Sequence, residues 1–243
     1  MSAETFNQRI ESLWAQHFGC PVEEFQREGT TLLPRERLQG QSMIHVVYIH
    51  RHALAEIDPG LQTRLSEALA GVGENAVLSS ELLGRLWGGG RIAEVDAGLV
   101  FHLRPGKLVR PDLDLQYTLR RLTPEDAAGL EALRKRCTEA ELEDAFVELN
   151  HEIGWGCFKG SQMAAVGSGY RRNGFMDFGV LTGPKFRGQG LARHVVVGLS
   201  DDTLALDLIP QYRCNRVNQP SRRVAEAAGF TLFFTTESVK LAG

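Results

Sequence analysis

The sequence has no hydrophobic run that approaches the roughly 18 residues needed to span a bilayer. It also lacks a secretory signal, because Met1–Cys20 does not follow the basic-then-apolar order and has polar residues such as Glu4 and Arg9 near its start. These two absences favour a cytoplasmic protein with no membrane partner.

Cysteine is scarce, and its four positions form neither a C-x-x-C pair nor a dense disulfide framework. We therefore expect free, mostly buried thiols at Cys20, Cys137, Cys157 and Cys214. A plausible metal-ligand set is missing as well. The only histidine cluster is His45, His50 and His52, and on a strand the first would face away from the other two. We expect no metal.

An excess of positive charge is also absent, since 27 Lys and Arg stand against 30 Asp and Glu and give a formal net charge of -3. No global positive field draws such a protein to nucleic acid, so no nucleic-acid partner is expected. What is present is an ordinary globular composition, with 43% hydrophobic and 23% charged residues.

The length of 243 residues exceeds the common domain size of about 100 to 150 residues and favours two domains. Two prolines, a glycine and several charges between Arg104 and Asp112 are typical of a linker. We predict an N-terminal α/β domain over 1–114 and a second domain over 115–243. The first could be a degenerate second copy of the second, or part of the acceptor-binding pocket.

Periodicity in the N-terminal part predicts a helix over 4–18, two helices around Leu61–Leu69 and Leu82–Leu86, and strands over 43–49 and 98–103. The second part shows clearer signals. It begins with a strand over 115–122, and two helices follow, which start at the N-caps Thr123 and Thr138.

Three strands then form an antiparallel meander over 155–159, 162–170 and 175–182, and a helix begins near Gly188. A short strand near 211–214, a helix over 221–228 and two final strands around 230–241 complete the pattern. The fold class is α/β of the α+β kind, with a mixed, mostly antiparallel sheet flanked by helices.

The most informative segment is the glycine-rich turn between the strand that ends at Thr182 and the helix that follows it. Helix N-termini with free N–H groups bind anions, and glycines let a phosphate approach the backbone. The turn does not fit a dinucleotide fingerprint, because Arg193 stands at the third glycine position, or a P-loop, because Gln189-Gly190 replaces Lys-Ser/Thr.

The turn does fit the pattern Q/R-x-x-G-x-G/A, as Arg187-Gly188-Gln189-Gly190-Leu191-Ala192, and here the sequence resembles the GNAT superfamily of N-acetyltransferases. A second block, Asn218-Gln219-Pro220-Ser221 through Gly229-Phe230, resembles the later helix of that family. The resemblance covers about half the chain and agrees with the predicted order of elements.

The resemblance implies that acetyl-CoA is the co-substrate, with its pantetheine along the strand and its pyrophosphate on the turn. The implied cofactor-binding residues are Val180, Leu181, Thr182, Arg187, Gly188, Gln189, Gly190, Leu191, Ala192, Asn218 and Ser221. A backbone N–H near Leu181 would polarise the thioester carbonyl. In the family, this strand splays from the next one to admit the cofactor.

The implied reaction is direct attack by a primary amine of a small molecule, through a tetrahedral intermediate. The candidate catalytic residues are Asp177 and Glu152 as bases and Tyr212 as an acid, because the position where many relatives carry the acidic tyrosine is Ala225. A peptide or protein amine is an alternative acceptor, and a non-catalytic acyl-CoA-binding module is an alternative function. A homodimer is also possible.

Overall fold

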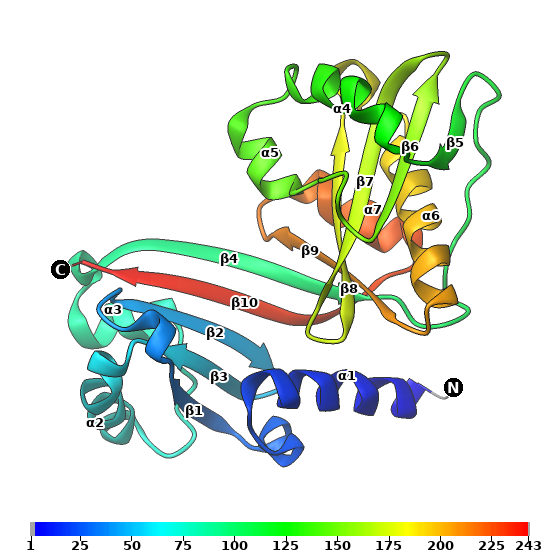
Figure 1. Ribbon diagram of the computed structural model, residues 1–243. Helices are drawn as coiled ribbons and strands as arrows, with labels where there is room; N and C mark the ends of the chain where they lie inside the picture. Colours follow the sequence, from blue (N-terminus) through cyan, green and yellow to red (C-terminus); the bar gives the residue numbers. More distant parts are fainter. Residues whose placement is uncertain (1–2, 243) are drawn as a thin grey trace. The chain divides into compact units, whose positions relative to one another are not determined.

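The computed structural model describes residues 3–242, and the chain divides into two compact units (Figure 1). Unit 1 contains Phe101–Cys214 and Asn218–Thr231. Among the described residues, unit 2 contains residues 3–100, Asn215–Val217 and residues 232–242. The units are thus discontinuous in sequence, unlike the linear division predicted at residue 114.

The sheet of unit 1 contains five strands in the order β9-β8-β7-β6-β5. Their bounds are Thr118–Arg121 for β5, Ile153–Lys159 for β6, Gln162–Arg172 for β7, Phe175–Thr182 for β8 and Ile209–Asn215 for β9. Strands β5 to β8 pair antiparallel, whereas β8 and β9 pair in parallel. The predicted meander is confirmed.

The helices of unit 1 begin within about three residues of the predicted positions. Their bounds are Pro124–Asp126 for the 3-10 helix η5, Ala127–Arg134 for α4, Glu139–Ala145 for α5, Pro184–Phe186 for η6, Leu191–Ala205 for α6 and Gln219–Ala228 for α7. Thr138 forms the predicted capping box with Glu141 at the start of α5. Thr123 forms a second capping box, which precedes α4.

Two glycines show that α5 and α6 cover opposite faces of this sheet. A Cβ at Gly179 in β8 would lie 1.9 Å from the carbonyl oxygen of Ala145, at the end of α5. Ser168 of β7 is the register partner of Gly179, and Gly167 is the neighbour of Ser168 in the same strand. A Cβ at Gly167 would lie 2.7 Å from Val195 of α6. Since neighbouring strand residues face opposite ways, the two helices lie on different faces. The α5 face is the one that concerns the site.

The sheet of unit 2 has the strand order β1-β3-β2-β10-β4. The strands run over Gly29–Pro34 for β1, Met43–Ile49 for β2, His52–Ile57 for β3, Ile92–His102 for β4 and Thr231–Leu241 for β10. The prediction of two final strands was wrong, because Thr231–Leu241 is one continuous strand. It contains none of the glycine, proline or asparagine residues that would form a turn.

Helices cover both faces of the strands of unit 2. The elements are α1 over Ala3–Phe18, α2 over Gln62–Val72 and α3 over Ser80–Trp87, with short 3-10 turns at Val22–Gln26, Glu36–Leu38, Pro59–Leu61 and Gly89–Arg91. Trp14 of α1 packs edge-on against Phe234 of β10, 5.3 Å between ring centroids. Leu65 and Leu83 instead share a core with Val239, which faces the other side of β10.

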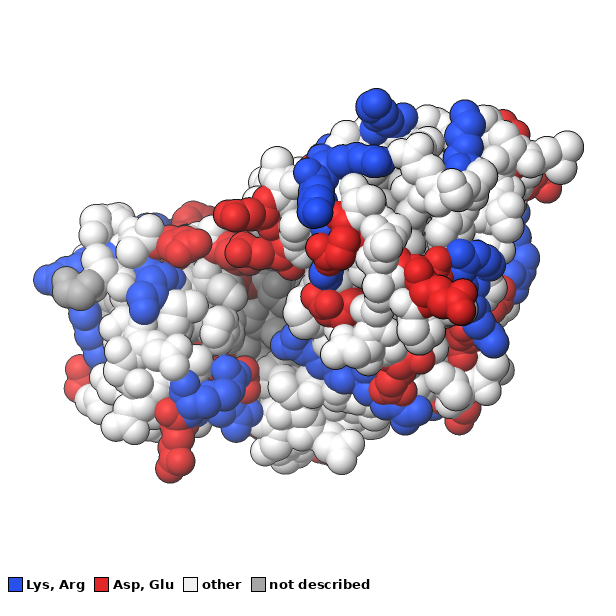
Figure 2. All heavy atoms as spheres, turned by 45° about the horizontal axis from the view of Figure 1, so that its top comes forward, with Lys and Arg blue, Asp and Glu red and all other residues white. Residues whose placement is uncertain are grey.

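Within residues 3–242, no helix is both long and apolar enough to cross a membrane. On the face drawn in Figure 2, Lys and Arg side chains lie among Asp and Glu side chains rather than forming a broad patch of one sign. This mixture agrees with the near-balanced charge of the sequence.

Candidate functional site

Strands β8 and β9 separate part-way along their length. They pair in parallel up to Phe178 opposite Tyr212, and no pair follows, although β8 continues to Thr182. Along its other edge β8 stays paired with β7 up to Thr182. In the described part of unit 1, residues 179–182 therefore have no strand partner on the β9 side. Such an edge can bind an extended ligand as an added strand.

The turn after β8 leads into the N-terminus of α6. Gly188 and Gly190 have φ values of +76° and +75°, the left-handed region that glycine adopts without steric cost. A Cβ at either position would meet no atom within 4 Å. Gly190 is the N-cap of α6, and neither a capping side chain nor an acid occupies this first turn. The N–H groups without a capping side chain and the helix dipole suit an anion.

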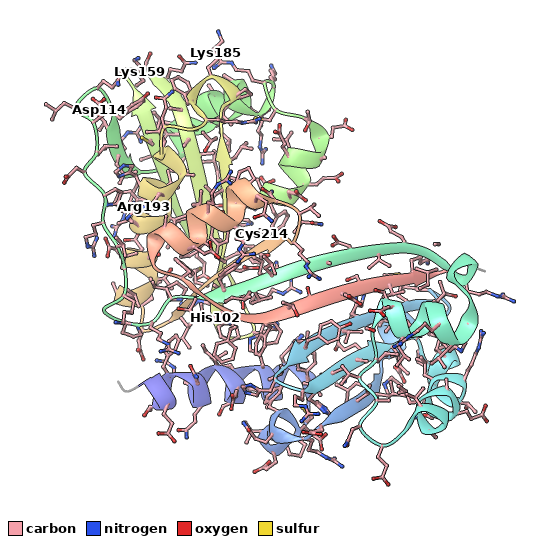
Figure 3. The ribbon with its side chains drawn as sticks, turned by 180° about the vertical axis from the view of Figure 1, so that it is seen from behind. His102, Asp114, Lys159, Lys185, Arg193 and Cys214 are labelled. Carbon is pink, nitrogen blue, oxygen red and sulfur yellow. The ribbon has the colours of Figure 1, made fainter. Side chains whose placement is uncertain are left out.

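Arg187 places a cation beside this turn. Its Nε donates to the carbonyl oxygen of Thr182 at 3.2 Å, and its guanidinium lies 2.8 Å from a carboxylate oxygen of Glu141 in α5. The N–H of Thr138, assisted by the charge of Arg187, lowers the pKa of Glu141. The Arg187 side chain remains 45% exposed, and its contact with a phosphate stays a prediction. Lys185 points outward at the end of unit 1 (Figure 3).

The second sequence block forms the start of α7 and its link to β9. Asn218 is the N-cap of α7 and accepts a hydrogen bond from the backbone N–H of Ser221 at 3.1 Å. The Ser221 hydroxyl lies 2.9 Å from that of Tyr212 in β9. Both residues therefore have structural partners, and their contact with CoA stays a prediction. Figure 3 shows Cys214 in β9, next to α7.

An open strand edge that ends in an uncapped, glycine-rich helix N-terminus is the geometry implied by the sequence motif. The sequence model of the GNAT acetyltransferase family matches residues 107–237. The chain belongs to the GNAT acetyltransferase family. It is thus an acyl-CoA-dependent acetyltransferase, and members of this family use acetyl-CoA as co-substrate.

Solved structures share the fold of this GNAT protein. A GCN5-related N-acetyltransferase from Sphaerobacter thermophilus matches with a TM-score of 0.57 and 15% identity, over 96% of this chain and 91% of that one. One from Kribbella flavida matches with a TM-score of 0.52 and 17% identity, over 97% and 95%. A GNAT-family acetyltransferase from Colwellia psychrerythraea matches with a TM-score of 0.52 and 16% identity, over 77% and 76%. No curated protein matches the chain.

Asp177, one of the predicted bases, lies in β8 on the α5 face. Its Oδ2 accepts hydrogen bonds from Arg213 Nε at 2.7 Å and from the Tyr170 hydroxyl at 3.0 Å. The side chain is only 2% exposed, and its Oδ1 is buried with no hydrogen-bond partner among the described residues. Arg213 is thus the charged partner of this buried carboxylate. A catalytic role for Asp177 stays a prediction.

The other two predicted catalytic residues have different surroundings. Glu152 is 42% exposed and forms an ion pair of 2.8 Å with Arg171. Tyr212 is 4% exposed, and burial raises the pKa of its hydroxyl to about 12. Ala225, where many relatives carry the acidic tyrosine, is fully buried. The surroundings of Glu152 and Tyr212 do not test their predicted roles as base and acid.

The sequence-based prediction did not include Ser168, which belongs to a polar cluster on the same sheet face as Asp177. Ser168 of β7 is fully buried, and its hydroxyl lies 2.8 Å from Nδ1 of His151. The His151 ring packs against Tyr170, with 4.9 Å between the ring centroids. A single hydroxyl inside the buried run Met163–Gly169 is the signal that could have identified this cluster.

Within the described residues 3–242, no group of three or more His, Cys, Asp or Glu side chains could hold a metal ion. The three histidines that lie close together in the sequence, His45, His50 and His52, have different surroundings in the structure. His45 contacts Ser238 at 2.9 Å and His52 contacts Thr31 at 3.0 Å, whereas His50 lies in a turn with a φ of +54°.

Proposed function

We propose that unit 1 transfers the acetyl group of acetyl-CoA to the primary amine of a small molecule by direct attack of the nitrogen on the thioester. The observation that carries this proposal is the separation of β8 from β9 immediately before the uncapped N-terminus of α6. The open edge and the anion site follow each other along the chain. They match the two chemically different parts of CoA, an amide-containing arm and a pyrophosphate.

The pantetheine arm has amide groups that can pair with a strand edge. In the proposed complex it pairs with Val180, Leu181 and Thr182 on the side where β9 has separated. A backbone N–H near Leu181 then donates to the thioester carbonyl and stabilises the oxyanion that develops during attack. Side-chain substitutions would leave this N–H in place, so the strand can be tested only indirectly.

The pyrophosphate is proposed to bind the turn and first helical residues, which supply N–H groups, helix dipole and one cation. These residues are Arg187, Gly188, Gln189, Gly190, Leu191 and Ala192. The open space around Gly188 and Gly190 supports close approach of a phosphate to the backbone. Asn218 and Ser221 at the start of α7 are proposed to contact the arm of the cofactor from the β9 side.

The acceptor is proposed to approach on the α5 face of the sheet. Helix α5 carries four acids within seven residues, Glu139, Glu141, Glu143 and Asp144. This concentration of negative charge supports an amine acceptor, which is a cation in water before it loses a proton. A peptide amine would share this chemistry and is therefore included in the test.

The test begins with acetyl-CoA binding by calorimetry for the full chain, followed by thiol release with small amines and peptides. Arg187→Gln should weaken binding at least about tenfold, since a charge-assisted hydrogen bond contributes about 1.5 to 3 kcal/mol. Arg91→Gln, an exposed cation in unit 2, is the matched control and should bind like the wild type.

Three results would count against the proposal in different ways. A wild-type protein that does not bind acetyl-CoA contradicts the cofactor site. If the protein binds acetyl-CoA but no amine stimulates thiol release, the result supports the non-catalytic acyl-CoA-binding module instead. The buried Ala225 and Tyr212 would then be residues of that module. Release with peptides but not with small amines changes only the acceptor.

A further inference from the structure

The point where β8 and β9 separate is also the point where the loop after α5 passes over the sheet. Gly179 is the first residue of β8 beyond the last pair with β9, and its partner on β7 is Ser168. The carbonyl oxygens of Ala145 and Phe146 lie so close to Gly179 that a Cβ would overlap them. Side chains of this loop that form a hydrogen bond with Ser168 therefore lie next to the proposed position of the thioester.

One such side chain is His151. The Ser168 hydroxyl accepts a hydrogen bond from the N–H of Glu148 at 3.1 Å and lies 2.8 Å from His151 Nδ1. A hydroxyl oxygen has two lone pairs, so Ser168 can accept Nδ1–H as well. It can do so for the neutral ring and for the imidazolium, and in the neutral ring Nε2 then carries the free lone pair.

The ring is also held by aromatic contacts. Phe146 and Tyr170 lie with ring centroids 5.2 and 4.9 Å from that of His151. This burial lowers the pKa of His151, although the nearby Glu148 carboxylate opposes the shift. The other charged groups of the cluster, Asp177 and Arg213, neutralise one another beyond Tyr170. His151 is therefore neutral at neutral pH and can accept a proton.

The carboxylates of the region are less suited to this task. Asp177 is buried against Arg213, and Glu152 is bound to Arg171 at the surface. Each of these carboxylates already has a guanidinium partner. His151 has no such ion pair within 4.0 Å among the described residues.

We propose that His151 accepts the proton that the acceptor amine loses as it attacks acetyl-CoA, with Ser168 as the positioning residue. The nitrogen forms a bond to the carbonyl carbon, and the carbon–sulfur bond breaks with its electron pair going to sulfur. The proton moves from nitrogen to His151 Nε2 and then, directly or through water, to the thiolate. The products are the N-acetylated amine and CoA. This inference rests on the proposed function.

The test compares His151→Gln and Ser168→Ala with His50→Gln, which makes the same change at an exposed histidine of unit 2. His151→Gln should lower kcat for amine-stimulated thiol release by about 100-fold or more. Its Kd for acetyl-CoA should stay within about twofold of the wild type. Ser168→Ala should lower kcat less, and His50→Gln should leave it unchanged.

The pH profile separates a base from a residue that only supports the fold. Wild-type kcat with a weakly basic arylamine, which is already neutral over about pH 5 to 8, should rise through a pKa below the ordinary 6.5 of histidine. NMR of histidine-labelled protein, assigned with His151→Gln, should show His151 titrating at that same pH. His151→Gln should lose this rise.

The outcomes are distinct. If His151→Gln keeps the wild-type rate and pH profile, or loses acetyl-CoA binding in proportion to its activity, His151 is not the base. If the wild type binds acetyl-CoA but no amine releases thiol, the proposed transfer itself fails, and the role of His151 fails with it.

Discussion

Asp177 and Glu152 are both acids of the candidate site, yet their surroundings predict different roles. The Asp177 side chain is 2% exposed, and the carboxylate oxygen that pairs with Arg213 also accepts a hydrogen bond from Tyr170. The Glu152 side chain is 42% exposed. A buried carboxylate with a cationic partner fixes the local structure, because its removal leaves the cation without compensation. A surface pair contributes little.

Asp177→Ala should therefore lower the free energy of unfolding by about 2 to 3 kcal/mol. This is less than for a fully buried pair, because the Arg213 side chain is 38% exposed. Glu152→Ala, the matched control, should change it by less than about 1 kcal/mol. Urea denaturation monitored by circular dichroism measures both. Equal effects of the two substitutions would contradict the structural role assigned to Asp177.

At the scale of elements, the start of α6 depends on two glycines with positive φ. Gly190→Ala should destabilise the protein by about 1 to 2 kcal/mol, since a left-handed alanine is strained although no neighbouring atom obstructs its Cβ. Relief of this strain would turn the first-turn N–H groups away from their common direction. Acetyl-CoA affinity should fall by about tenfold, or about 1.4 kcal/mol.

Gly89→Ala is the control for Gly190→Ala, because that glycine also has open space around its Cβ position but no positive φ. It should change neither stability nor affinity. Thermal unfolding and calorimetry check both variants. An unchanged acetyl-CoA affinity for Gly190→Ala would argue against this turn as the pyrophosphate site.

Local signals were sufficient to predict the elements of unit 1. The capping box at Thr138, the glycine turn before α6 and the tight turns that join β6, β7 and β8 all act between near neighbours in sequence. The family match over residues 107–237 agrees with these motifs. Sequence could therefore predict the α/β class and the candidate cofactor turn.

Elements stabilised by distant partners were missed. Strand β3 contains the buried Glu56, which is neutralised by Arg35 and Arg37 from outside the strand. Its sequence, His52–Ile57, alone has neither clear alternation nor strong β-formers throughout. The link between Ser168 and His151 spans 17 residues and depends on how the loop after α5 crosses the sheet. The local pattern around Ser168 can indicate a buried hydroxyl that needs a partner, but it does not identify His151 as that partner.

At the scale of the whole molecule, both ends of the chain contribute to unit 2. Strand β10 lies between β2 and β4 in the sheet order, although it follows unit 1 in sequence. Its residues Phe234 and Val239 also belong to the cores on the two faces of that sheet. The family match ends within this strand, so the matched region and the compact unit 1 do not coincide.

Deletion of residues 232–243 should therefore unfold unit 2, because it removes an internal strand and leaves two strand edges and two core faces uncovered. Unit 1 retains its own sheet and helices and should keep its amide protection. Hydrogen exchange with mass spectrometry resolves the two regions: loss of protection is expected in β2 and β3, and retention in β7 and β8.

Leu232→Ser, at a position 41% exposed in β10, is the control and should preserve protection in both regions. Loss of protection in both units after the deletion would mean that they unfold as one cooperative structure, and unit 1 could then not be studied as a separate acetyltransferase domain.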